Sequence, residues 1–249
     1  MIPNSNLITQ RGGFYVLYFS LMLITYIGSL ASAIVFYIWH ITTIDTFNTI
    51  TRYPVLLSPT HLLYGFIFVL YLALAYWLVQ VKKTGPTAKR AVLFSGSMLL
   101  QIALFATWHL EYIRYMFIVN VLLTVTLYYL YRTYPIADRL ARLPISLYLA
   151  SVTFSMIFMF ELTVVFYSFH GFGLSKQLWV IILLTFSTAL ALRLRYHYND
   201  RAFSIAFIII YLGIALRLGL DELLVTMCAL FLSGVLVAGI LYVQKNMAA

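Results

Sequence analysis

Glu161 is the residue whose type and position most clearly suggest chemistry, because it lies within the apolar sequence Met-Ile-Phe-Met-Phe-Glu-Leu. An ionisable side chain inside a run that can cross a membrane is costly and marks a candidate functional site. At helical spacing, Glu161 shares a face with four residues that include small and polar ones: Ser146, Ala150, Phe154 and Ile157. The sequence therefore predicts two alternatives: a proton- or cation-responsive group that lines an internal cavity, or a protonated carboxyl bonded to a neighbouring helix.

Two amides in other apolar runs have a similar choice of roles. Gln101 lies near the middle of its run and shares a helical face with Trp108, while Asn120 lies in the following run. A buried amide can hold a polar atom of a ligand, but it more often bonds another helix. The packing role is therefore the expected one, and Gln101 is kept as a ligand candidate.

Four of the five histidines map to the predicted outer ends of different apolar runs: His40, His61, His109 and His170. A convergent group of imidazoles could bind a metal or a haem iron. No HxxxH or HExxH pair occurs on one run, so a metal site is not predicted. The single cysteine, Cys228, lies inside an apolar run and forms no disulfide framework or cysteine-based metal motif.

Sequence signatures of catalysis are missing from the chain. There is no GxSxG motif for a nucleophilic serine and no GxxxxGK[ST] motif for a nucleotide. The glycines Gly171 and Gly173 lack the strand that a dinucleotide fingerprint requires. No catalytic residue is predicted, and a function other than catalysis is favoured.

The elements that must position these residues are membrane spans. Of 249 residues, 63% are apolar and only 9% are charged. In a typical soluble domain roughly half of the residues are apolar and about a quarter are charged. The net charge of +9 comes from basic residues in short loops, where they set topology, so nucleic acid binding is not expected. Apolar runs of about 20 residues predict eight spans, near 14–39, 61–81, 91–110, 115–134, 145–168, 176–196, 202–218 and 223–243.

Lysine and arginine are strongly biased to one side of these eight spans. Of the 16 in the chain, twelve fall on one side and four on the other, namely Arg52, Arg114, Lys176 and Arg217. The bias predicts a multi-pass protein with both termini in the cytoplasm. A seven-span alternative, without the marginal run 202–218, puts basic residues on both sides, so eight spans are preferred.

Several segments near predicted helix ends carry a recognisable set of motifs. Residues 57–68 and 71–77 open the second helix, residues 108–112 end the third, and residues 143–149, Leu-Pro-Ile-Ser-Leu-Tyr-Leu, open the fifth. Together they resemble the TspO/MBR family, the tryptophan-rich sensory or translocator proteins. The long bacterial branch of this family adds helices after a five-helix unit, and residues 171–175 and 201–206 are similar to its later part.

This resemblance implies an all-α integral membrane protein with about eight transmembrane helices. A TspO-like five-helix bundle is expected over residues 14–168 and three additional helices over residues 169–249, in one continuous membrane domain. The implied location is the bacterial cytoplasmic membrane, and family members often form homodimers. The bilayer and a small hydrophobic ligand are the expected partners.

The family binds tetrapyrroles and other flat, amphipathic molecules in a pocket among five helices, capped by the loop after the first helix. The resemblance therefore implies a receptor for a tetrapyrrole-like ligand, with residues 40–60 as the gate. The pocket is expected in the outer half of the second, third and fifth helices. Its expected residues are His61, Gln101, Trp108, Tyr148 and Glu161.

The chain departs from the family at several ligand positions. Leu63 or Phe66 stands where the family has tryptophan, and Gln101 stands where it has asparagine. The fold is therefore better supported than porphyrin binding. Two other functions stay open: a transporter or channel subunit with Glu161 and Gln101 on the substrate path, and a membrane scaffold for a protein partner.

Overall fold

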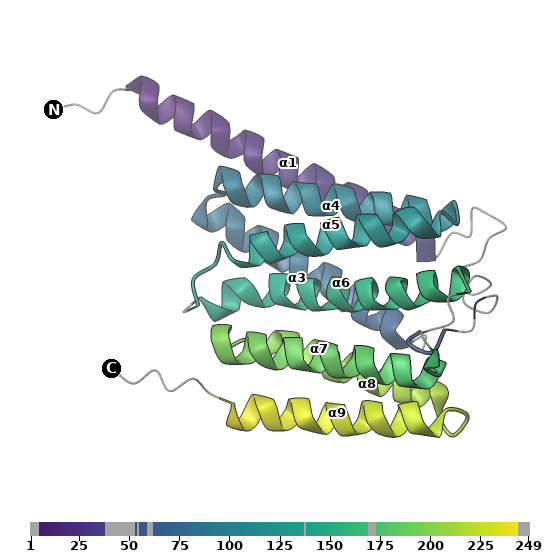
Figure 1. The fold of residues 1–249 in the computed structure, drawn as a ribbon. Coiled ribbons are helices and arrows are strands. Elements are labelled where there is room, and N and C mark those ends of the chain that lie inside the picture. Colours follow the sequence, from purple (N-terminus) through teal and green to yellow (C-terminus); the bar gives the residue numbers. More distant parts are fainter. Residues whose placement is uncertain are drawn as a thin grey trace.

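The computed structural model describes residues 5–37, 53, 55–58, 62–136, 138–168 and 173–243. Within those residues all regular secondary structure is helical. The helices are α1 (Ser5–Tyr37), α3 (Leu62–Thr84), α4 (Ala88–His109), α5 (Ile113–Tyr131), α6 (Arg139–Phe166), α7 (Lys176–Tyr198), α8 (Ala202–Leu218) and α9 (Leu223–Tyr242). They correspond one to one with the eight predicted spans (Figure 1).

Seven of these helices are long and apolar enough to cross a membrane, and α8 is a shorter apolar helix of 17 residues. At 1.5 Å per residue, α8 is about 25 Å long, slightly less than the hydrocarbon thickness. Its bounds coincide with the run predicted at 202–218. The protein is thus an all-α membrane protein, with a five-helix bundle followed by three further helices.

Two helices begin more than one turn earlier than their apolar runs predicted. Helix α1 begins at Ser5 and not at residue 14, and α6 begins at Arg139 and not at residue 145. Hydropathy detects only the part of a helix that suits hydrocarbon, whereas the helix itself continues into polar residues. Helix α6 also contains Pro144, which lies close to the N-terminus of the helix. Asp138 caps that N-terminus by accepting the Ala141 N–H at 3.3 Å.

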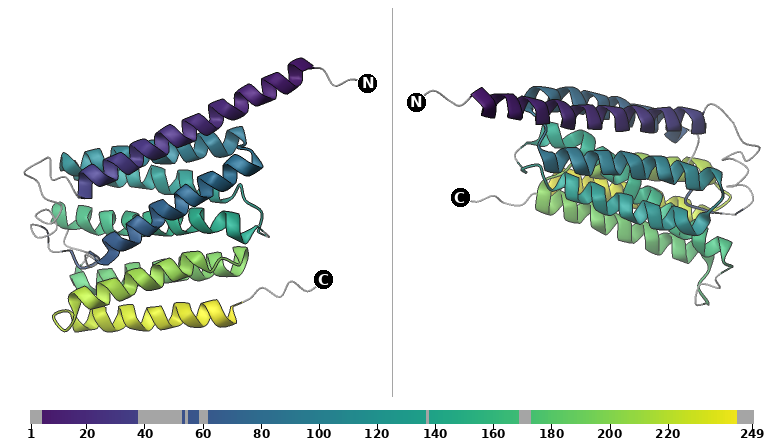
Figure 2. Two further views of the ribbon diagram at one scale, coloured as in Figure 1. Left: turned by 180° about the vertical axis from the view of Figure 1, so that it is seen from behind. Right: turned by 90° about the horizontal axis from the view of Figure 1, so that it is seen from above.

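The first five helices pack in a closed ring. Around this ring α1 packs on α4, α4 on α5, α5 on α6, α6 on α3, and α3 on α1. In the view from behind, α3 crosses obliquely in front of its neighbours, and it contacts both α1 and α6 (Figure 2). Helices α4 and α6 therefore face each other across the interior of the ring.

The last three helices pack on one another and join the ring mainly through α8. Helix α8 contacts α7 and α9 on one side and α6 and α3 on the other. One cluster of buried apolar side chains extends from Met22 in α1 to Leu236 in α9. The five-helix ring and helices α7–α9 thus share a continuous hydrophobic core.

The bundle has two ends, which we call the terminal face and the opposite face. The terminal face holds the start of α1, the end of α9 and the turns after α3, α5 and α7 (Figure 1). The opposite face holds residues 55–58 and the turns after α4, α6 and α8. The terminal face therefore corresponds to the predicted side that is rich in lysine and arginine.

Candidate functional site

Glu161 binds a short segment of the connection between α1 and α3. We call residues 55–58 the strap. The Glu161 carboxylate, only 7% exposed, accepts the backbone N–H of Leu56 through Oε1 at 2.7 Å and that of Leu57 through Oε2 at 2.9 Å. The sequence predicted either a group lining a cavity or a bond to a neighbouring helix. In the structure the carboxylate instead bonds a connecting segment.

Arg217 holds the same strap from a second helix. It lies in the last turn of α8, and its Nη1 donates to the carbonyl oxygens of Val55 at 3.2 Å and Ser58 at 2.7 Å. Val55, Leu57 and Ser58 are buried. The ring of Tyr53 adds an edge-to-face contact with Phe166 of α6, with 5.7 Å between centroids. The strap is therefore fastened to both α6 and α8.

A hydrogen bond crosses the interior of the five-helix ring. The hydroxyl of Tyr148 on α6 donates to Oε1 of Gln101 on α4 at 3.1 Å. Tyr148 is buried at 3% exposure. This brings two of the predicted site residues together, and it gives Gln101 the interhelical partner expected of an amide within an apolar run.

Further hydroxyl groups meet between α1 and α3. The Tyr26 hydroxyl donates to the carbonyl oxygen of Tyr71 at 2.8 Å, and the Tyr71 and Ser29 hydroxyls are 2.9 Å apart. All three residues are buried. The ring interior thus contains polar groups from α1, α3, α4 and α6 within an otherwise apolar surrounding.

Trp108 also reaches across the ring. Its indole stacks on Phe158 of α6, with ring centroids 6.2 Å apart and planes inclined by 28°. Phe158 lies three residues before Glu161 on the same helix, so Trp108 belongs to the end of the ring near the strap. Tyr148 lies nearer the beginning of α6, so the predicted site residues occupy two levels and not one.

Asn120 has the packing role expected for it. Its Nδ2 donates to the hydroxyl of Ser155 on α6 at 2.7 Å, and the residue is completely buried. His61, His40 and His170 lie outside the described residues, so their part in the site stays a prediction. Among the residues that the structure does describe, no group of three His, Cys, Asp or Glu side chains could hold a metal ion.

Asp200 was not singled out from the sequence, yet it organises the terminal face. Its Oδ2 accepts the hydroxyls of Tyr131 and Ser146, each at 2.6 Å, and its Oδ1 accepts the N–H groups of Ala202 and Phe203 at 3.0 and 3.3 Å. It therefore joins α5 and α6 to the start of α8. An aspartate just before a helix start is a recognisable capping signal, but its two hydroxyl partners are not visible in sequence.

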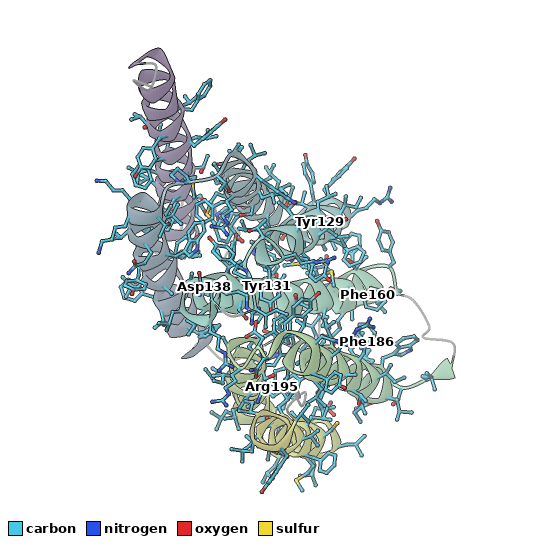
Figure 3. The ribbon with its side chains drawn as sticks, turned by 90° about the vertical axis from the view of Figure 1, so that its left-hand side faces the viewer. Tyr129, Tyr131, Asp138, Phe160, Phe186 and Arg195 are labelled. Atoms are coloured by element: carbon cyan, nitrogen blue, oxygen red, sulfur yellow. The ribbon has the colours of Figure 1, made fainter. Side chains whose placement is uncertain are left out.

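Two buried arginines reinforce the terminal face. Arg142 of α6 donates to the carbonyl oxygen of Tyr198 at 2.6 Å, and Arg195 of α7 donates to that of Ile240 at 3.0 Å. Seen from this end, Tyr131 lies within the bundle and Arg195 lies among the last three helices, while Tyr129 lies on the outer side (Figure 3). These bonds connect α6 to the end of α7, and α7 to α9.

A second contact at this face involves the turn after α5. The Trp77 indole donates to the Tyr134 hydroxyl at 2.9 Å, and the Arg90 guanidinium lies 4.1 Å from the centroid of the Tyr134 ring. Burial raises the pKa of Tyr134 to about 12, with Arg90 opposing the shift, so the phenol is neutral at physiological pH. This contact fixes α3 and α4 to the connection between α5 and α6.

This fold and site define a polytopic helical membrane protein in which a ring of five helices encloses a few polar groups in an apolar interior. The family model described as TSPO-like protein matches residues 19–242, a range that reaches from α1 to the end of α9. The chain therefore belongs to the TSPO-like protein family, as the motifs in its sequence predicted. Searches of curated proteins and of solved structures gave no match.

Proposed function

We propose that this TSPO-like protein is a receptor that binds a flat, amphipathic, tetrapyrrole-like molecule inside the five-helix ring. The hydrogen bond from Tyr148 to Gln101 carries this proposal, because it joins two helices that face each other across the interior. Binding sites for small molecules are mostly apolar, with a few polar groups that fix orientation. A hydroxyl donor and an amide at this position suit that description.

The ligand would be held by burial and oriented by these two groups. A carboxylate or carbonyl of the ligand could replace Gln101 as the acceptor of the Tyr148 hydroxyl, and the Gln101 amide would then be free to donate to it. The nearly parallel rings of Trp108 and Phe158 offer an aromatic surface on which a flat molecule can stack. The strap would close the opposite face above them.

The receptor interpretation is preferred over the other two functions. A transport path would need Glu161 to face a substrate, but in the structure both of its carboxylate oxygens bond the strap. A scaffold would not need a polar pair inside the ring. A homodimer, the cytoplasmic position of both termini and a bacterial membrane location remain predictions that the receptor proposal does not require.

The proposal is tested by titrating the purified protein in detergent with protoporphyrin IX and with haem. Tryptophan fluorescence reports binding because Trp108 lies within the ring, and thermal unfolding is followed in parallel. A ligand that binds only the folded state stabilises it by about 2.7 kcal/mol at a hundredfold excess over its Kd. Saturable quenching with a matching rise in stability is expected, and the lack of both signals would contradict the proposal.

The position of the site is tested by Tyr148→Phe. This change removes the hydroxyl but keeps the ring, so protoporphyrin IX should bind about fivefold more weakly if one hydrogen bond of about 1 kcal/mol is lost. Tyr211→Phe is the matched control, because Tyr211 is an equally buried tyrosine whose hydroxyl bonds Ser187 at 2.7 Å, away from the ring. Equal affinity in the two variants would move the site elsewhere.

A further inference from the structure

The strap places irregular backbone where membrane helices end. Its residues are not helical and three of the four are buried, so their N–H and C=O groups need partners within the protein. Glu161 accepts from Leu56 and Leu57, and Arg217 donates to Val55 and Ser58. A carboxylate thus satisfies two donors and a guanidinium satisfies two acceptors, which is the complementary use of the two charges.

The two anchors belong to different parts of the molecule. Glu161 is on α6, a member of the five-helix ring, whereas Arg217 is on α8, one of the three additional helices. Arg217 lies 162 residues after Val55 and 159 residues after Ser58 in the sequence. Helix α8 therefore reaches from the additional helices to the connection between α1 and α3.

Helix α8 is held firmly enough to serve as a support. Asp200 fixes its first turn to Tyr131 of α5 and Ser146 of α6 at the terminal face. Along its length it packs against α6 and α3. Its last turn ends at Gly219, whose φ of 52° stops the helix directly after Arg217 and Leu218. The guanidinium is thereby presented at a fixed height on the opposite face.

We propose that Arg217 is a positioning residue that holds the strap over the ring, so that the three additional helices control how fast a ligand enters and leaves. The anchoring itself is independent of any ligand. The control of ligand exchange rests on the proposed function, because it requires a ligand inside the ring.

Hydrogen–deuterium exchange on the full-length protein tests the anchoring. In Arg217→Gln, the amides of Leu56 and Leu57 should exchange about tenfold faster, because the loss of charge-assisted bonds makes opening of the strap easier. Arg217→Lys retains a donor and should restore part of the protection. Arg114→Gln is the matched control, since Arg114 lies at the same face but bonds the Tyr167 hydroxyl at 3.0 Å, and it should leave exchange at the strap unchanged.

Equal exchange in Arg217→Gln and the wild type would overturn the anchoring, as would equal acceleration in Arg114→Gln. Partial recovery of amide protection in Arg217→Lys also distinguishes anchoring from a general loss of folding. A general loss of folding would not be repaired by lysine at the strap alone. Thermal unfolding of each variant confirms that the compared proteins are folded.

Stopped-flow mixing with protoporphyrin IX tests the control of ligand exchange. Both the association and the dissociation rate should rise severalfold in Arg217→Gln, with a smaller change in the equilibrium constant, because the strap alters access and not the contacts inside the ring. Unchanged rates together with faster amide exchange would overturn this part. If the wild type bound no protoporphyrin IX, the proposed function would fail, while the exchange data would still decide whether Arg217 anchors the strap.

Discussion

Glu161 and Asp200 are two buried carboxylates at opposite ends of the same bundle, and they are used differently. Each accepts two backbone N–H groups. Asp200 takes them from α8, two and three residues ahead in the chain, whereas Glu161 takes them from the strap, 105 and 104 residues away. Asp200 also binds two hydroxyls from other helices, so its site joins helices, and the Glu161 site joins a connection to a helix.

This difference means that the Asp200 site stabilises the helix bundle, whereas the Glu161 site holds a segment that can open locally. Removing Asp200 would leave buried groups on α5, α6 and α8 without their acceptor, and those helices cannot move apart without exposing the core. Removing the bonds to Glu161 would free a segment that can lift while the helices remain packed. The terminal face is therefore expected to govern unfolding, and the opposite face to govern local opening.

Asp200→Ala should have the largest effect on the free energy of unfolding. It removes four hydrogen bonds from a buried site and leaves the donors without acceptors, so a loss of about 3 to 5 kcal/mol is expected. Denaturant titration in mixed micelles, together with thermal unfolding, measures this loss. Asp221→Ala is the control, because Asp221 is exposed in the turn after α8, and its loss should stay within about 0.5 kcal/mol. Similar losses in both variants would refute the role given to Asp200.

Glu161→Gln should reduce the free energy of unfolding less, by about 1 kcal/mol. The amide keeps one acceptor oxygen for the strap but turns an NH₂ group toward the other backbone N–H, and the strap can open to relieve this. Glu222→Gln is a suitable control, since Glu222 is on the same face and bonds Gln177 at 3.3 Å. A loss as large as that of Asp200→Ala would remove the distinction between the two faces.

Tyr131→Phe should have the smallest effect of the three, about 0.5 to 1 kcal/mol, as expected for one interhelical hydrogen bond in a membrane protein. The ring remains to contact Tyr198 and the Arg142 guanidinium, with centroid distances of 5.6 and 5.1 Å. The same unfolding measurement applies, with Tyr129→Phe as an exposed control that should not change stability. If Tyr131→Phe lowered the free energy of unfolding as much as Asp200→Ala, the Tyr131 hydroxyl bond alone would account for the stabilisation that Asp200 provides at the terminal face.

The helices could be predicted well because their signal is local. Apolar length places every span, and Gly85 and Pro135 mark turns where apolar runs stop. Helix starts were less accurate for α1 and α6, since a helix can extend beyond its apolar part. The motifs of residues 57–68, 108–112 and 143–149 together predicted the family that the comparison confirmed.

The site was predictable only in part. Glu161, Gln101 and Asn120 could be chosen because polar residues in apolar runs need partners, and each has one in the structure. Their partners could not be chosen, because any helix or loop at the same depth was a candidate. Arg217 was counted only as a basic residue on one side of the membrane, and Asp200 was not singled out, since helix ends carry such residues for topology and capping alone.

The sequence by itself determined that this is a helical membrane protein, where its spans lie and which family it belongs to, because the length of an apolar run and short motifs are properties of neighbouring residues. Only the tertiary structure decided that α8 and α6 hold the strap together. That result depends on contacts between residues more than a hundred positions apart, and the order in which helices pack fixes those contacts while the sequence pattern of each helix alone does not.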